Sequence, residues 1–133
     1  MKLFIDASVW LAAIRNPEGA SGTILKLASK GKVFTTWTSF IITEIKNNLP
    51  PNSKFQAIER LIKPQLITIT PKEIFHWVNL LPDKDCHVLA GALKAKADYL
   101  ISLDKKHILK AEIQNIFPIP IRSSSEFLRY WVT

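Results

Sequence analysis

Two aspartates follow directly after apolar segments that are typical of buried strands. Asp6 comes after residues 3–5, and Asp104 comes after residues 99–103. In open α/β sheets, ligands bind beyond the carboxyl ends of the strands, so we expect both acids at the same edge. A carboxylate held beside a buried strand is costly without a positive partner. Because Mg²⁺ and Mn²⁺ prefer oxygen ligands, a group of such acids could bind a divalent cation.

Two further acids are candidates for the same cluster. Asp85 begins a predicted helix, and Glu44 lies in an apolar helical segment at the border of its predicted buried face. Simpler interpretations stay open, because each aspartate can be a plain helix cap and Glu44 an ordinary surface glutamate. Asp83 competes with Asp85, and we interpret it as the more exposed turn residue. Asp6 and Asp104 nevertheless lie at equivalent places in two strand–helix units, which favours a shared site.

Strand-like segments alternate with helical ones along the chain. Runs of β-branched, aromatic and other apolar residues predict strands at residues 3–5, 33–37, 66–70, 99–103 and 119–121, the last near an edge because of its prolines. Apolar periodicity predicts helices at residues 21–29, 39–49, 53–62, 71–78, 85–97 and 123–131. The expected helix caps are Ser39, Ser53, Asp85 and Ser123 or Ser124. This alternation predicts a three-layer α/β/α sandwich with a central, mostly parallel sheet of about five strands.

The bulk composition favours one domain over residues 1–133. The chain is 47% hydrophobic and 22% charged, as in an ordinary globular protein. No apolar run is long enough for a secretory signal or a membrane span, so we expect a cytosolic protein without a membrane partner. The single Cys86 excludes a disulfide framework. A net charge of +7 and a pI of about 9.7 favour an anionic partner, nucleic acid first, although many small proteins are basic for solubility alone.

Four blocks of the sequence resemble the PIN-domain family. Residues 4–10 (FIDASVW) are similar to its opening strand and first acid, and residues 43–45 (TEI) to the helix that carries its second. Residues 85–92 (DCHVLAGA) are similar to the helix start with the third acid, and residues 97–105 (ADYLISLDK) to the closing strand with the fourth. The last block is the most specific. All four match in order and spacing, and the resemblance is weakest at residues 50–81.

The resemblance implies a metal-dependent ribonuclease, and many relatives are toxins of VapBC-type toxin–antitoxin pairs. It implies catalytic, metal-binding carboxylates at Asp6, Glu44, Asp85 and Asp104. We expect Asp6 and Asp85 to be the main direct ligands of Mg²⁺ or Mn²⁺ and Asp104 to be a direct or water-mediated one. Glu44 is expected to orient a water or a second ion. RNA as substrate, a small antitoxin as partner and a homodimer are further implications.

Hydroxyl and basic residues complete this expectation. Ser8 and Ser102 are expected to donate hydrogen bonds that fix the carboxylates. The family often has Thr at the place of Ser102, and serine keeps the hydroxyl. Lys105 and Lys106 could bind RNA phosphates, or they could form a solvated face. Cys86 stands where relatives often carry a polar or basic residue, which leaves its contact with substrate open.

The histidines and tryptophans are assigned no catalytic role. The three histidines have no zinc-ligand spacing with each other or with the cysteine, so no zinc site is predicted (His76, His87, His107). His87 is expected to be packed within an apolar helix. Trp10 and Trp37 could stack on bases, but core packing or a dimer contact is the more frequent use of tryptophan.

Other functions are less compatible with these residues. An aspartyl phosphotransferase would need a second acid two residues after Asp6, where this chain has Ser8. A dinucleotide-binding domain would need a glycine-rich turn after the first strand, which is missing. A catalytically weak PIN-like module that binds RNA or protein stays open, because fold does not fix activity. The complete carboxylate set favours the enzyme over this module.

Overall fold

The central layer of the molecule is a five-stranded parallel sheet. A computed structural model describes residues 1–131. Its strands are β1 (Lys2–Ile5), β2 (Phe34–Trp37), β3 (Gln65–Leu66), β4 (Tyr99–Ile101) and β5 (Ile121–Arg122). They lie in the order β3-β2-β1-β4-β5, and every neighbouring pair is parallel. The predicted fold class is thereby confirmed, and β1 lies at the centre of the sheet.

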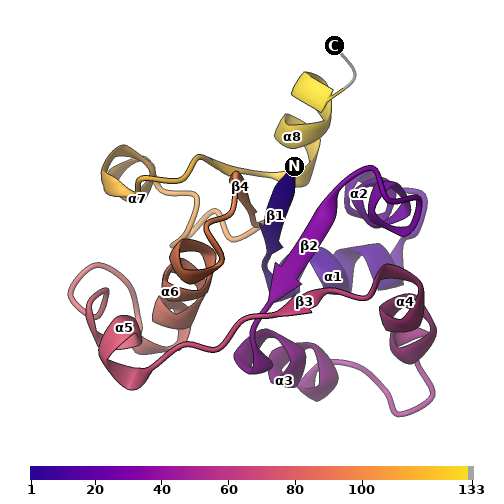
Figure 1. The fold of residues 1–133 in the computed structure, drawn as a ribbon, viewed down its shortest axis with the longest axis horizontal. Coiled ribbons are helices and arrows are strands. Elements are labelled where there is room, and N and C mark those ends of the chain that lie inside the picture. The colour runs from indigo at the N-terminus through magenta and orange to yellow at the C-terminus, as the bar shows by residue number, and fades with distance from the viewer. Residues whose placement is uncertain (132–133) are drawn as a thin grey trace.

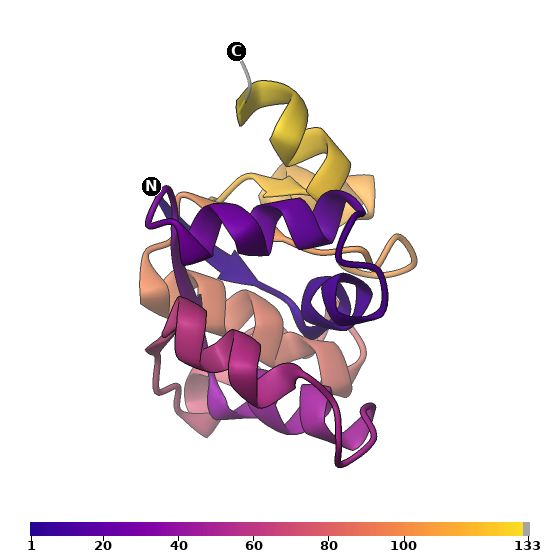
Figure 2. The same ribbon diagram turned by 90° about the vertical axis from the view of Figure 1, so that its right-hand side faces the viewer.

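Helices flank this sheet on both sides (Figures 1 and 2). They are α1 (Ala7–Arg15), α2 (Ala20–Ser29), α3 (Ser39–Asn47), α4 (Phe55–Ile62), α5 (Pro71–Phe75), α6 (Cys86–Ala95), α7 (Ala111–Ile116) and α8 (Ser124–Trp131), with a short 3₁₀ turn at Asp83–Asp85. Helix α6 packs on β1 and β2 beside α5, and α1 packs on α2. None of the helices within residues 1–131 has the length and apolar character that a membrane crossing requires.

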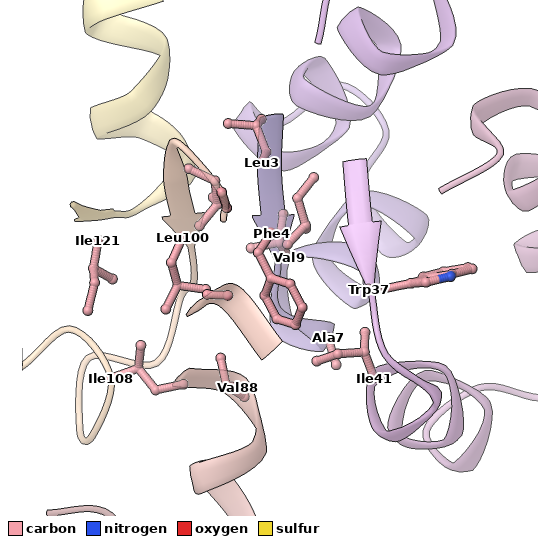
Figure 3. Close-up of a cluster of buried hydrophobic side chains, with 14 of the residues drawn as sticks. Leu3, Phe4, Ala7, Val9, Trp37, Ile41, Val88, Leu100, Ile108 and Ile121 are labelled. Atoms are coloured by element: carbon pink, nitrogen blue, oxygen red, sulfur yellow. The ribbon is translucent and has the colours of Figure 1, made fainter. Parts of the chain in front are cut away.

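The core surrounds β1, whose residues Leu3, Phe4 and Ile5 are fully buried. Figure 3 shows side chains from several elements converging on this strand. A strand that is covered on both faces needs a continuous apolar run, which is why these residues do not alternate with polar ones. The same burial places Asp6, the next residue, at the end of a rigid strand.

Gly91 allows α6 to approach β1 closely. A Cβ atom at this position would lie 2.5 Å from Cζ of Phe4 and 3.0 Å from Cγ2 of Thr38. Both neighbours are buried, so the contact cannot be relieved by a side chain moving into solvent. The glycine therefore sets the distance between the sheet and the helix that begins beside Asp85.

We expect Gly91→Ala to lower the free energy of unfolding by about 1–3 kcal/mol, because it overpacks a filled core. Urea denaturation measures the change. The control is the same substitution in a Phe4→Leu background, where the shorter side chain leaves room for the added methyl group. An equal cost of Gly91→Ala in both backgrounds would show that Phe4 is not the obstacle.

Two helices were not predicted, and the strands predicted at residues 66–70 and 99–103 are shorter in the structure; the second ends at Ile101, so Asp104 follows it after two further residues. Helix α1 was not predicted because its residues are apolar on almost every side, which hides the amphipathic period; Ala7, Val9, Trp10, Leu11 and Ala13 are all buried. Helix α7 has six residues, too few for a clear period. The strand predicted at residues 66–70 pairs with β2 only through Gln65–Leu66. Strand β2 ends at Trp37, and the following residues turn into α3 and offer no partner.

Some predicted helix caps were wrong. Helix α3 is capped by Thr38, which accepts a hydrogen bond from the amide of Ile41, and not by Ser39. Helix α4 has Lys54 at its cap position, so Ser53 is not the cap residue, although its hydroxyl accepts a 3.5 Å hydrogen bond from the amide of Phe55. Asp85 occupies the cap position of α6 but makes no side-chain cap hydrogen bond. Its carboxylate is therefore left for other contacts.

Candidate metal centre

Asp6 lies at the carboxyl end of β1 and is buried, with only 4% of the residue exposed. Its Oδ1 accepts a 2.8 Å hydrogen bond from the amide of Ala7, which caps α1. Its Oδ2 accepts hydrogen bonds from the hydroxyls of Ser102, at 2.8 Å, and Ser8, at 3.2 Å. Asp6 thus caps a helix, as the simpler interpretation held, and is also fixed by two hydroxyl donors.

Both serine hydroxyls are themselves oriented by the loop after β4. The amide of Asp104 donates to Ser102 Oγ, and the amide of Leu103 donates to Ser8 Oγ, each at 3.1 Å. Because each oxygen accepts from the backbone, its proton is directed toward the carboxylate of Asp6. Ser102 therefore joins Asp6 and Asp104, the two strand-end aspartates, through one hydroxyl group.

Asp104, Asp85 and His107 form a compact group beyond β4. His107 Nδ1 lies 3.2 Å from Asp85 Oδ2 and 3.5 Å from Asp104 Oδ2. One ligand atom from each residue lies within 4.8 Å of the other two, a spacing that a single metal ion could bridge. Asp85 Oδ2 is buried and has no hydrogen-bond partner within residues 1–131. The structure thus brings together two predicted acids and a histidine for which no metal role was predicted.

Glu44 lies on α3, half-buried, with Oε1 3.7 Å from Nε2 of His87. His87 is buried and stacks on Phe40 with ring centroids 5.3 Å apart, as expected for a packed residue. Burial lowers the pKa of His87, which favours the neutral ring. Glu44 therefore has no strong cationic partner in this contact.

Burial and neighbouring acids raise the pKa values of Asp6, Glu44 and Asp85. Burial, together with the charge of Glu44, raises the pKa of Asp6 to about 6 against the opposing serine and amide hydrogen bonds. Burial and the charges of Asp85 and Asp104 raise the pKa of Glu44, opposed by Lys84. Burial and Asp104 also raise the pKa of Asp85, opposed by His107 and Lys84. The charge of Glu44 thus acts on Asp6, and the charges of Asp85 and Asp104 act on Glu44, so a cation bound near these groups would relieve the repulsion.

The residues around the acids differ in whether a ligand could reach them. Lys105 and Lys106 are exposed beside Asp104. Trp10 and Trp37 are buried and pack with ring centroids 4.9 Å apart, so they belong to the core and cannot stack on bases. Cys86 is buried as well, and its thiol donates to the carbonyls of Leu81 and Pro82. Lys105 and Lys106 are thus accessible cations next to Asp104, and Lys84 is exposed near Glu44 and Asp85.

An apolar groove begins beside Glu44. One cavity of about 580 Å³ is lined by Glu44, His87, Phe40 and Ile74 among others. A second, of about 450 Å³, shares Phe40 and Ile74 and continues past Phe75 and other apolar residues of α5. Phe75 is 71% exposed. An acidic site thus adjoins an open apolar surface.

Comparison with known proteins identifies the family. A sequence profile described as PIN domain matches residues 2–106. The chain belongs to the PIN-domain family. That match includes all four blocks on which the resemblance was based, and Asp6, Glu44, Asp85 and Asp104 lie within it. No curated protein matches the chain.

Solved structures share the fold of this PIN domain. A chain in the crystal structure of VapBC2 from Rickettsia felis, bound to a DNA fragment from their promoter, superposes with a TM-score of 0.61 at 14% identity. The match covers 92% of the PIN-domain chain and 98% of the other. A chain of VapBC-1 from nontypeable Haemophilus influenzae gives a TM-score of 0.60 at 14% identity and covers 94% and 99%. At this identity the likeness establishes the fold.

His107 is the residue of this centre that sequence reasoning missed. His107 has no zinc-ligand spacing with the other histidines or with Cys86, and it lies beside two aspartates instead. A usable signal was its place three residues after Asp104, a predicted strand-end acid. Asp104 Oδ1 accepts from the amides of Lys106 and His107, and this turn brings the imidazole back to the carboxylate.

Proposed function

We propose that this PIN-domain protein is a metal-dependent endoribonuclease that cleaves single-stranded or structured RNA. It holds one or two Mg²⁺ or Mn²⁺ ions on Asp6, Glu44, Asp85 and Asp104. The observation that carries the proposal is geometric: Asp85 and Asp104 lie close enough to share one ion, and Ser102 links Asp104 to Asp6 through hydrogen bonds. Burial and neighbouring acids also raise the pKa values of Asp6, Glu44 and Asp85, as is common for functional acids. Membership of the PIN-domain family supports nuclease activity.

The residues present fit a divalent cation. Asp85 Oδ2 is a buried, partly negative oxygen without a hydrogen-bond donor in the described chain, and an ion would supply the missing partner. Carboxylate oxygens are the preferred ligands of Mg²⁺ and Mn²⁺. When bound, such an ion lowers the pKa of a coordinated water and polarises a phosphodiester.

Each side chain around the proposed ion has a distinct role. Asp6 and Asp85 are the principal ligands, and Asp104 is a direct or water-mediated one. Ser102 and Ser8 hold Asp6 in one orientation through their hydrogen bonds to Oδ2. Glu44 is half-buried at the mouth of the groove, where it can orient a water or a second ion. No protein nucleophile is required, because water attacks the phosphorus atom.

Lys105 and Lys106 supply positive charge for the substrate. They lie exposed immediately after Asp104 and can contact phosphates on either side of the scissile bond. Contacts of this kind release counterions, so they make RNA affinity fall as the salt concentration rises.

We expect Ser102→Ala to lower cleavage about 10- to 100-fold, the usual cost of losing a group that orients a metal ligand. The alanine removes the 2.8 Å hydrogen bond to Asp6 and leaves the amide of Asp104 without its acceptor. Ser102→Thr keeps the hydroxyl and is the matched control. Equal loss in both variants would assign the effect to packing, since both change the side chain's volume but only one removes the donor.

Cleavage of a mixed-sequence RNA with purified protein tests the proposed function. Activity should require Mg²⁺ or Mn²⁺, stop with chelator and return when metal is restored. Cleavage that continues in chelator would contradict the metal mechanism. If folded, metal-loaded protein binds RNA but cuts none of a diverse set, the chain is the PIN-like binding module instead.

A small antitoxin is the proposed protein partner. The groove formed by Phe40, Ile74 and Phe75 suits an apolar segment, and the adjoining acids suit an Arg or Lys inserted from it. The structures with the same fold are VapBC complexes, which supports a partner of this kind. Co-expression with the product of the neighbouring gene should suppress cleavage, and full activity in a stable complex would contradict this.

We also propose that residues 1–133 form one PIN-like domain, that the protein is a homodimer and that it acts in the cytosol. The family match over residues 2–106 and the structural matches over more than nine-tenths of the chain support one domain. Light scattering during gel filtration distinguishes a dimer from a monomer of 15.1 kDa.

A further inference from the structure

The imidazole of His107 stands among the proposed metal ligands without a side-chain hydrogen bond in the described chain. Its Nδ1 is 3.2 Å from Asp85 Oδ2 and 3.5 Å from Asp104 Oδ2. A charge-assisted hydrogen bond between nitrogen and carboxylate is shorter, about 2.7–2.9 Å. Asp85 Oδ2 has no hydrogen-bond partner in the described chain even though this nitrogen is its neighbour. The imidazole thus lies within salt-bridge distance of both acids, and in the described chain it makes a side-chain hydrogen bond to neither.

The backbone holds the imidazole in this place. Asp104 Oδ1 accepts hydrogen bonds of 3.1 Å from the amides of Lys106 and His107, which fix the turn after β4. The other oxygen of the same carboxylate, Oδ2, is the one that faces the imidazole. His107 is itself only half-buried, so its orientation does not result from tight packing. The turn therefore places His107 Nδ1 and Asp104 Oδ2 where both could bind the same ion.

The separations match those of ligands that share one ion. Metal–ligand bonds of about 2.1–2.2 Å place adjacent ligand atoms about 3.0–3.5 Å apart in octahedral or tetrahedral geometry. Both measured distances from Nδ1 fall in or at the end of this interval, and one ligand atom of each of the three residues lies within 4.8 Å of the others.

We propose that His107 Nδ1 coordinates the cation together with Asp85 and Asp104, and that the site therefore prefers Mn²⁺ to Mg²⁺. This inference rests on the proposed metal centre and adds a ligand to it. Imidazole nitrogen is a good ligand for first-row transition ions, whereas Mg²⁺ strongly prefers oxygen. One nitrogen beside carboxylates shifts selectivity toward the transition ion and still allows Mg²⁺ to bind through oxygen alone.

Calorimetric titration with Mn²⁺ and with Mg²⁺ tests the proposal on the full chain. The variants are His107→Gln and, as a matched control at an exposed histidine outside the centre, His76→Gln. We expect His107→Gln to weaken Mn²⁺ binding about 10- to 100-fold and Mg²⁺ binding less than about 3-fold. The control should bind both ions as wild type does. If His107→Gln binds both ions as tightly as wild type does, or more tightly, the imidazole is only a counter-charge and the proposal is wrong.

Pulsed electron paramagnetic resonance of the Mn²⁺-loaded protein gives a second readout that is independent of catalysis. Wild type should show coupling of Mn²⁺ to a directly bound ¹⁴N nucleus, and His107→Gln should lose it. Bound Mn²⁺ without nitrogen coupling in wild type would overturn the role of His107 and leave the carboxylate centre standing. Wild type that binds neither ion would overturn the proposed metal centre itself.

Discussion

Asp85→Asn should lower metal-dependent RNA cleavage by about 10³-fold. The substitution removes a ligand charge, and a bound metal supplies several kcal/mol of transition-state stabilisation, of which each 1.36 kcal/mol is tenfold in rate. Asparagine has nearly the same size as aspartate. The raised pKa of Asp85 shows that its charge is unfavourable in the metal-free fold, so the variant should fold normally.

Asp83→Asn is the matched control for this prediction. Asp83 is exposed, lies two residues earlier and is not part of the group formed by Asp85, Asp104 and His107. The Asp83→Asn variant should cleave at the wild-type rate although it changes the local charge by the same amount, because Asp83 is not a proposed ligand. Equal losses in Asp83→Asn and Asp85→Asn would mean that net charge near α6, and not ligation, controls activity. Single-turnover cleavage at saturating Mn²⁺ separates the two outcomes.

Asp6→Asn should make the metal-free protein more stable at neutral pH, by about 1–3 kcal/mol. Raising a pKa from 3.8 to about 6 corresponds to about 3 kcal/mol of unfavourable free energy once the group is ionised. Asparagine removes this cost and keeps an oxygen that can accept from the amide of Ala7. Its amide group must donate to Ser8 and Ser102 in place of accepting, which reduces the gain.

The pH dependence has a definite sign. The folded-state pKa of Asp6 lies above its unfolded value, so the folded protein holds this proton more tightly. Stability from this group is present below pH 3.8 and is lost as pH rises toward and through 6. The advantage of Asp6→Asn over wild type should therefore be near zero at pH 4 and fully developed at pH 7.

Chemical denaturation with chelator, repeated across this pH range, measures the difference between the two proteins. Saturating Mn²⁺ should raise the stability of wild type more than that of Asp6→Asn, because an ion that binds only the folded state stabilises it. A variant less stable than wild type at pH 7 in chelator would contradict the unfavourable charge at Asp6.

The positions of Asp6 and Asp104 beyond the ends of β1 and β4 could be predicted because they depend on local pattern. Asp6 and Asp104 each follow an apolar segment, and parallel strands carry the residues after them to one edge. Asp85 was correctly separated from Asp83, which is exposed. Glu44 required the family resemblance, since nothing in its helix distinguishes it from a surface glutamate.

Features that the pattern of residue types does not record were not predictable in the same way. His107 reaches the acids through a turn that Asp104 builds with its own carboxylate, and no helix or strand period records such a turn. Helix α1 is buried, so it lacks the polar face from which amphipathic helices are recognised. The strand at residues 66–70 has the right residue types, but only its beginning meets a partner strand.

Crystallography of the protein with Mn²⁺ tests the central claim most directly, because anomalous scattering locates the ion without reference to activity. A manganese peak should lie within bonding distance of carboxylate oxygens from Asp6, Asp85 and Asp104. If protein that cleaves RNA gives crystals in which manganese lies elsewhere, or in which no manganese lies among these side chains, the account is contradicted.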